Sequence, residues 1–206
     1  MTILSVDLAS RRYQDIGIAV IAYVGGVVRV RFVKPHRTFT KGRPVATVLA
    51  AFLSGIAEEV GSRVIFIDGP QGWKHPENGL KHSRMRERVL FTPGKTGLPG
   101  SVKPTSWTHM AEFSIQLFDA LAEAGYRRLM EAADLSAAKR LAIESFPTSA
   151  WRSLGRKPLA GKSKDWLAHV EDRLSALREF IPISLDEQPS HDELQALIAD
   201  LQDSRC

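Results

Sequence analysis

Three short apolar runs of the chain each end in a single acidic residue. They are Ile3–Asp7, Val64–Asp68 and Leu141–Glu144. An unpaired carboxylate is costly to bury, so three of them at the ends of apolar strands indicate that a cation lies between them. Carboxylate oxygens are the ligands that Mg²⁺ and Mn²⁺ prefer. We therefore expect these three acids to bind divalent metal.

A fourth acid lies near the end of the chain, in the sequence Ser190-His191-Asp192-Glu193. Ser190 and Glu193 have the spacing of a capping box, which predicts that a helix begins at Ser190. An acid in the first turn of a helix also interacts favourably with the helix dipole, and this is the alternative explanation for Asp192. We expect Asp192 to be a further metal ligand.

A long segment, residues 69–104, follows the second acid and is rich in proline and glycine. Only a short helical piece is expected in it, near residues 83–90, and loops of this length in compact domains are often functional. Its basic and aromatic side chains could contact phosphates and stack on bases, although a solvated helix face and a core tryptophan would look the same. A second basic group follows Pro147. The predicted substrate contacts are Trp73, Lys74, Arg84, Arg88 and Lys162, and Lys164 is predicted to act beside the carboxylates.

The order of the predicted elements would bring the acids together. Residues 2–9 indicate a strand, and Gly25-Gly26 between two β-rich runs is typical of a hairpin. The β-helix-β connection that follows usually gives parallel neighbouring strands. The predicted elements are strands at 2–9, 16–24 and 27–33, a helix at 44–60, a strand at 64–68, one or two helices within 105–132, a strand at 140–146, a helix near 164–180 and a helix from 190.

This order predicts an α/β fold with the ribonuclease-H-like layout. We expect a mixed five-stranded sheet, with three antiparallel strands followed by two parallel strands, flanked by helices. Residues 1–206 would form a single domain. In such a sheet the first, second and third acids meet at the carboxyl ends of neighbouring strands, where ligand sites of α/β sheets form.

Composition limits the classes of protein that fit. The chain has 206 residues, of which 44% are hydrophobic and 25% charged, as in ordinary globular proteins. It has no apolar run long enough to span a membrane and no N-terminal leader, and its single cysteine, Cys206, rules out an internal disulfide. We expect a cytoplasmic protein without a membrane partner. The net charge of +5 is compatible with a nucleic acid partner, although many basic proteins bind none.

Other chemistries fit the sequence less well. Gly94-Lys95-Thr96 looks like the end of a phosphate-binding loop, but Val89 stands where its first glycine belongs. The six histidines form no His-x-x-x-His pair, which disfavours a histidine zinc site. The stretch from Asp7 to Ser10 echoes the phosphate loop of actin and the sugar kinases, but Ala9 replaces the required glycine and the chain is too short for two duplicated domains.

Several motifs occur in a distinctive order from Val6 to about Leu197. They are Val6-Asp7-Leu8-Ala9, Ile67-Asp68-Gly69-Pro70, the Arg84/Glu87 stretch, Glu144-Ser145-Phe146-Pro147 and Leu154–Leu159. In this order they resemble domain-of-unknown-function family 429. The resemblance implies a ribonuclease-H-like fold, a predicted nuclease activity, acids at Asp7, Asp68, Glu144 and Asp192, and a basic residue at Lys162 or Lys164. The last helix departs from the family pattern, because His-Asp-Glu-Leu replaces its alanine-rich stretch.

The main hypothesis is a metal-dependent phosphodiester hydrolase, specifically a nuclease. Two Mg²⁺ or Mn²⁺ ions, bound by the four acids, would activate water and stabilise the leaving oxygen. A non-catalytic binding module that kept the fold is the first alternative. A phosphotransferase of the actin and sugar-kinase type is the second.

Overall fold

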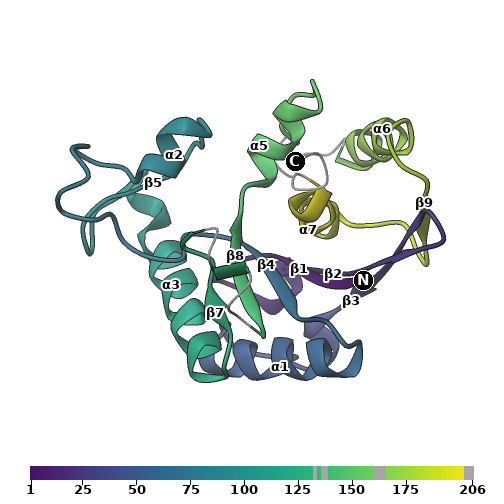
Figure 1. The fold of residues 1–206 in the computed structure, drawn as a ribbon, viewed down its shortest axis with the longest axis horizontal. Helices are drawn as coiled ribbons and strands as arrows, with labels where there is room; N and C mark the ends of the chain where they lie inside the picture. Colours follow the sequence, from purple (N-terminus) through teal and green to yellow (C-terminus); the bar gives the residue numbers. More distant parts are fainter. Residues whose placement is uncertain (132–133, 136–138, 160–165, 202–206) are drawn as a thin grey trace.

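The computed structural model describes residues 1–131, 134–135, 139–159 and 166–201 of the chain. Its centre is a seven-stranded sheet in the order β7-β8-β4-β1-β2-β3-β9 (Figure 1). Strands β1, β2 and β3 are antiparallel, and β4 and β8 continue the sheet parallel to β1. The strands are β1 Thr2–Asp7, β2 Gly17–Val24, β3 Val27–Val33, β4 Val64–Asp68, β7 Arg127–Arg128, β8 Leu141–Ser145 and β9 Ile183–Leu185.

This order confirms the predicted ribonuclease-H-like layout and corrects the predicted number of strands. The five predicted strands are present, and the edge strands β7 and β9 extend the sheet to seven. Each edge strand has only two or three residues, too few to show the alternating pattern that reveals a strand in a sequence. The predicted Gly-Gly hairpin is also confirmed, because Gly25 and Gly26 have φ angles of 56° and 79°, as a tight turn between such strands requires.

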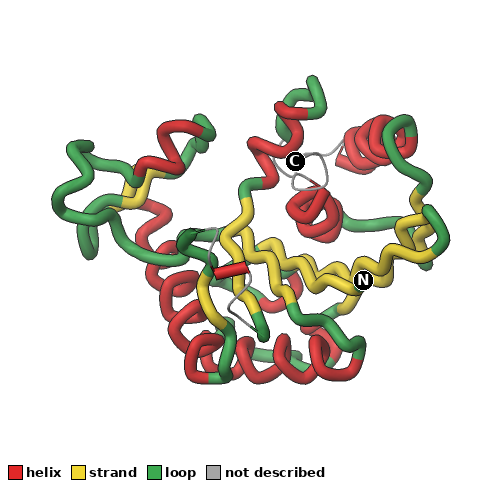
Figure 2. Tube along the Cα trace, in the orientation of Figure 1, coloured by secondary structure: helices red, strands yellow, loops and turns green. Residues whose placement is uncertain are grey.

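Helices cover both faces of the sheet, as the ribbon and tube views show (Figures 1 and 2). Helices α1 and α3 lie on one face, and α5, α6 and α7 lie on the other. The helix α2 and a small hairpin of strands β5 and β6 extend beyond the sheet, on the side of α3. The bounds are α1 Ala46–Glu59, α2 Met85–Val89, α3 Thr108–Glu123, α5 Pro147–Ser153, α6 Trp166–Arg178, α7 His191–Leu201, β5 Lys95–Thr96 and β6 Val102–Lys103, with short 3-10 turns at Tyr13–Asp15, Pro35–Arg37 and Thr105–Trp107.

The helices agree with the predictions except after residue 123 and at α5, a short helix after β8 that was not predicted. The helical stretch predicted to reach residue 132 ends at Glu123, because Gly125, with φ 89°, turns the chain back to form β7. The predicted capping box of α7 is confirmed. The Ser190 backbone N–H donates to Glu193 Oε2 at 2.8 Å, and the Glu193 backbone N–H donates to Ser190 Oγ at 3.3 Å.

Alternation of side chains divides the hydrophobic core between the two faces of the sheet. Val6 and Ile67 belong to the cluster that includes buried residues of α1 and α3. Ala19 and Ile21 belong to the cluster that includes residues of α5, α6 and α7. Neighbouring positions of one strand therefore lie in different chemical surroundings, and this determines where the acidic side chains point.

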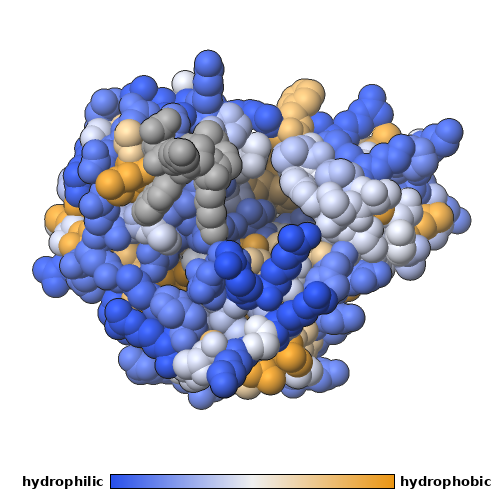
Figure 3. Space-filling model, turned by 180° about the vertical axis from the view of Figure 1, so that it is seen from behind, coloured by the Kyte–Doolittle hydropathy of each residue, from blue (hydrophilic) through white to orange (hydrophobic). Residues whose placement is uncertain are grey.

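The surface is mostly polar. Figure 3 shows hydrophilic side chains over most of the face opposite to the view of Figure 1, with hydrophobic residues in scattered patches. No helix in the described ranges is long and apolar enough to cross a lipid bilayer.

Trp151 joins α5 to α7 and should contribute measurably to stability. Its side chain is fully buried, and its Nε1–H donates to Gln195 Oε1 at 2.9 Å. We expect Trp151→Phe to lower the free energy of unfolding by about 1–2 kcal/mol, because it removes this hydrogen bond and leaves a small cavity. Urea unfolding measures the change. Phe91→Leu, at a side chain that is 76% exposed, is the control, and equal stability of the two variants would contradict the expectation.

Candidate functional site

Asp7 and Asp68 form a carboxyl pair at the carboxyl ends of two parallel strands. They are register partners of β1 and β4, so their side chains leave the same face of the sheet. The two side chains interact directly, and a hydrogen bond between two carboxyl groups forms only when one of them carries a proton. Burial raises the pKa of Asp68 to about 7; the hydrogen bond with Asp7 opposes this rise and the charge of Glu144 adds to it. A divalent cation can therefore replace one proton at this pair.

The beginning of helix α7 brings Asp192 to the same face. Gly17 is the register partner of Asp7 in β2, and a Cβ atom at Gly17 would lie 2.2 Å from the carbonyl carbon of Asp192. Only a glycine allows the helix to approach the strand so closely. The side chain of Asp192 is buried, and its Oδ1 lies 3.2 Å from Nδ1 of His191. Three of the four predicted acids thus come from neighbouring elements on one face of the sheet.

A buried hydroxyl group adds another oxygen to this edge. Ser145 is the register partner of Asp68 in β8, and its Oγ is buried with no hydrogen-bond partner among the described residues. Carboxylate and hydroxyl oxygens are hard ligands that suit Mg²⁺ or Mn²⁺. Within the described ranges, no three His, Cys, Asp or Glu side chains are grouped closely enough to hold a metal ion. The Asp7–Asp68 pair still fits Mg²⁺, which commonly takes one or two carboxylates and fills its other positions with water and substrate phosphate.

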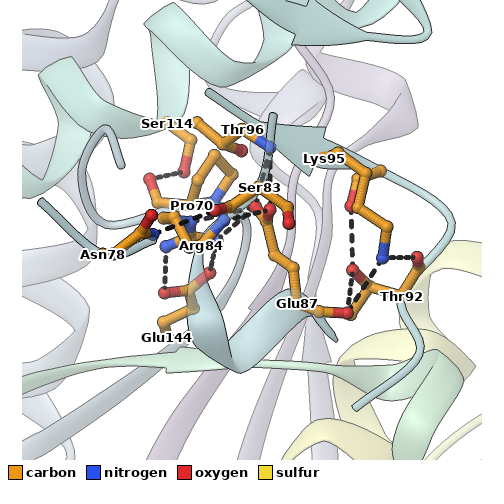
Figure 4. Close-up of polar contacts among 11 residues, drawn as sticks. Pro70, Asn78, Ser83, Arg84, Glu87, Thr92, Lys95, Thr96, Ser114 and Glu144 are labelled. Carbon is orange, nitrogen blue, oxygen red and sulfur yellow. Dashed lines mark hydrogen bonds and ion pairs between the residues drawn. The ribbon is translucent and has the colours of Figure 1, made fainter. Parts of the chain in front are cut away.

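Glu144 has a different environment from the aspartate pair. Its register partner is Ile67, one position before Asp68, so its side chain leaves the opposite face of the sheet. Its carboxylate accepts hydrogen bonds from both terminal nitrogens of Arg84, at 2.7 and 2.5 Å (Figure 4). Burial raises the pKa of Glu144, although the bonds from Arg84 oppose the rise. The carboxylate of Glu144 is thus paired with a guanidinium group.

Arg84 is held in turn by the loop that carries it. Its Nε donates to Glu87 Oε1 at 2.9 Å, and its backbone N–H donates to Glu87 Oε2 at 3.0 Å. The backbone N–H of Thr96 donates to both carboxylate oxygens of Glu87, at 3.0 and 2.8 Å, and Lys95 Nζ donates to the Glu87 carbonyl at 2.9 Å. These contacts join α2 to strand β5 (Figure 4).

A cavity of about 470 Å³ lies between this loop and the ends of the strands. Asp68, Arg84, Glu87 and Glu144 line it together with apolar residues from the start of α3 and the end of β1. The indole of Trp107, 44% exposed, lies on another wall against Gly94, where an added Cβ would be 2.7 Å from the ring. The cavity thus combines an apolar, aromatic surface with charged groups.

Of the predicted substrate contacts in the described part of the chain, Arg84 lines the cavity, but Trp73, Lys74 and Arg88 do not. Lys74 is buried, and its ammonium group donates to the carbonyls of His75 and Pro76, both at 3.0 Å, so it stabilises its own loop. Trp73 is partly buried and Arg88 is exposed on α2, and neither is among the described residues that line the cavity. The predicted residues Lys162 and Lys164 lie outside the described residues.

Sequence reasoning missed three residues of this region as site candidates. Glu87 could have been noticed, because it follows Arg84 at the three-residue spacing that allows contact within one helical turn. Trp107 and Arg11 line the cavity from segments far from the acids in sequence, and no local pattern indicates their position.

Comparisons with known proteins identify a family and two similar folds. A family model described as "Protein of unknown function (DUF429)" matches residues 6–205. The structure of Thermus thermophilus RuvC is similar at 13% sequence identity and a TM-score of 0.44, covering 98% of this chain and 92% of RuvC. T. thermophilus RuvC in complex with a Holliday junction substrate is similar at 12% identity and a TM-score of 0.38, with the same coverage. The search of curated proteins gave no match. The family match thus extends over nearly the whole chain.

Proposed function

The chain belongs to the DUF429 family of proteins of unknown function, and we propose that it is a metal-dependent phosphodiester hydrolase that acts as a nuclease. The observation that carries this proposal is the Asp7–Asp68 pair, two hydrogen-bonded carboxyl groups at the carboxyl ends of parallel strands. A strongly raised pKa beside a cavity is common at functional sites. Asp192 also lies on this face and stays a predicted ligand, although the three aspartates are not grouped closely enough in the structure to hold one ion.

Different residues would have different roles in the proposed reaction. Asp7 and Asp68 would exchange their shared proton for a Mg²⁺ or Mn²⁺ ion, and a bound ion supplies an acidified water as the nucleophile. The apolar cavity could take an unpaired base, with Trp107 as the stacking surface. Arg11 on the cavity wall and the exposed Arg88 are the proposed contacts for phosphate. The substrate class is therefore nucleic acid with at least one unstacked nucleotide.

The Asp7→Asn variant tests the proposal. We expect wild-type protein to cleave at least one of single-stranded RNA, DNA or an RNA–DNA hybrid with Mn²⁺, and Asp7→Asn to abolish this cleavage, because a neutral amide cannot replace the carboxylate ligand. Gel assays follow cleavage and circular dichroism checks the fold. Glu77→Gln, at an exposed acid, is the control. Absence of cleavage by wild type on every substrate, with Mg²⁺ and with Mn²⁺, would contradict the proposal.

One observation favours a binding module as the second candidate. No group of three possible metal ligands occurs in the part of the chain that the structure describes, so the fold could serve to bind nucleic acid without cleaving it. Calorimetric titration with Mn²⁺ separates the two functions. A module would bind oligonucleotides in the presence of a chelator and would give no Mn²⁺ signal that depends on Asp68.

A further inference from the structure

The acids at this sheet edge form two separate groups. Asp7 and Asp68 are register partners and leave the face that α7 covers, on which Asp192 also lies. Glu144 is the partner of Ile67, a residue of the core cluster that contains α1 and α3. Alternation of side chains therefore places Glu144 and the aspartate pair on opposite faces of the sheet, although Asp68 and Glu144 both line the cavity at its edge.

Glu144 has a cation of its own. The Arg84 guanidinium binds both of its carboxylate oxygens, at 2.7 and 2.5 Å, in the parallel two-bond arrangement that gives the strongest ion pairs. The side chains of Arg84, Glu87 and Glu144 are 12%, 3% and 1% exposed. Separating such a pair would leave buried charges without partners, which is strongly unfavourable.

The position of Arg84 is fixed by the loop around it. Glu87 contacts the guanidinium at 2.9 Å with one oxygen, and Thr96 of β5 donates its backbone N–H to the same carboxylate. Figure 4 shows Arg84 between the two glutamates, with Glu87 connecting it to Thr96. The guanidinium is therefore held on both sides, and it lines the cavity beside Asp68.

We propose that this centre holds a single divalent ion at Asp7 and Asp68, and that Arg84 provides at Glu144 the positive charge that a second ion provides in a two-metal site. The inference rests on the proposed function and refines its metal content. A guanidinium group cannot acidify water, but it can bind a phosphate oxygen and stabilise negative charge. Arg84 would thus orient a phosphodiester beside the single ion.

Counting the bound Mn²⁺ ions tests this inference without measuring activity. Calorimetric titration of the full chain at about pH 8 should give one ion per wild-type molecule, and electron paramagnetic resonance of Mn²⁺ should show no coupled ion pair. We expect Glu144→Gln also to bind one ion, with an affinity within about threefold of wild type, since Glu144 is not its ligand. Asp68→Asn should bind none.

The Arg84→Met variant makes the converse test. This substitution removes the guanidinium group and leaves the buried carboxylates of Glu87 and Glu144 without a cation. We therefore expect the Arg84→Met protein to bind a second Mn²⁺ ion. Lys81→Met, at an exposed cation three residues before Arg84 in the same loop, is the matched control and should bind one ion.

The outcomes separate this inference from the proposed function. Two ions on wild type, loss of an ion in Glu144→Gln, or one ion on a folded Arg84→Met would overturn the inference alone. No Mn²⁺ on wild type would overturn both. If Arg84→Met does not fold, the comparison of wild type with Glu144→Gln still decides the matter.

Discussion

In metal-free buffer at about pH 8, the Asp68→Asn variant is expected to unfold at a higher temperature than the wild-type protein. Burial raises the pKa of Asp68 to about 7, so its ionised form is disfavoured in the folded state. Such a group stabilises the fold fully below its unfolded-state pKa, and this contribution is lost as the pH rises towards and through the folded-state value. An asparagine stays neutral and can donate a hydrogen bond to Asp7 at every pH.

We expect a gain of about 2 kcal/mol for Asp68→Asn above pH 7, or roughly 4–8 °C in Tm, and little difference near pH 4. Added Mn²⁺ should reverse the order, because an ion that binds only the folded wild type raises its stability in proportion to the logarithm of metal concentration. Differential scanning calorimetry with a chelator and with Mn²⁺ measures both effects. Glu77→Gln is the control, and a variant that is less stable than wild type at about pH 8 without metal would refute the argument.

The local features of the fold could be predicted from the sequence because short-range contacts determine them. The hairpin at Gly25-Gly26 needs two positive φ angles, which glycine adopts without strain, and the capping box at Ser190 joins residues three positions apart. The acids at the ends of β1, β4 and β8 follow from the apolar runs before them.

The register between strands could not be predicted, and it changes the interpretation of Glu144. Asp7 and Asp68 are the last residues of their strands, whereas Glu144 lies one residue before the end of β8. A shift of one position moves a side chain to the other face of the sheet. The structure pairs Asp68 with Asp7 but pairs Glu144 with Ile67. The ion pair of Arg84 with Glu144 joins residues 60 positions apart, a distance over which local sequence patterns carry no information.

The affinity for Mn²⁺ is expected to fall steeply as the pH is lowered from about 8 to 5. The metal binds the ionised carboxyl pair, and the hydrogen-bonded pair of Asp7 and Asp68 holds a proton below the raised pKa of about 7. Each pH unit below that value should therefore weaken binding about tenfold, which gives roughly a hundredfold between pH 7 and pH 5. Ordinary aspartates, with pKa values near 4, would give a nearly constant affinity over the same range.

Calorimetry in two buffers of different ionisation enthalpy counts the protons released when Mn²⁺ binds. Close to one proton should be released near pH 6, because the pair is protonated there before the metal arrives, and close to none near pH 9. Glu144 is a charged neighbour of the pair, and the same titration on Glu144→Gln isolates its effect. The substitution removes a charge that raises the pKa of Asp68, so it should move the onset of proton release to lower pH. Proton release that is absent at every pH would show that the aspartate pair does not exchange a proton for the metal.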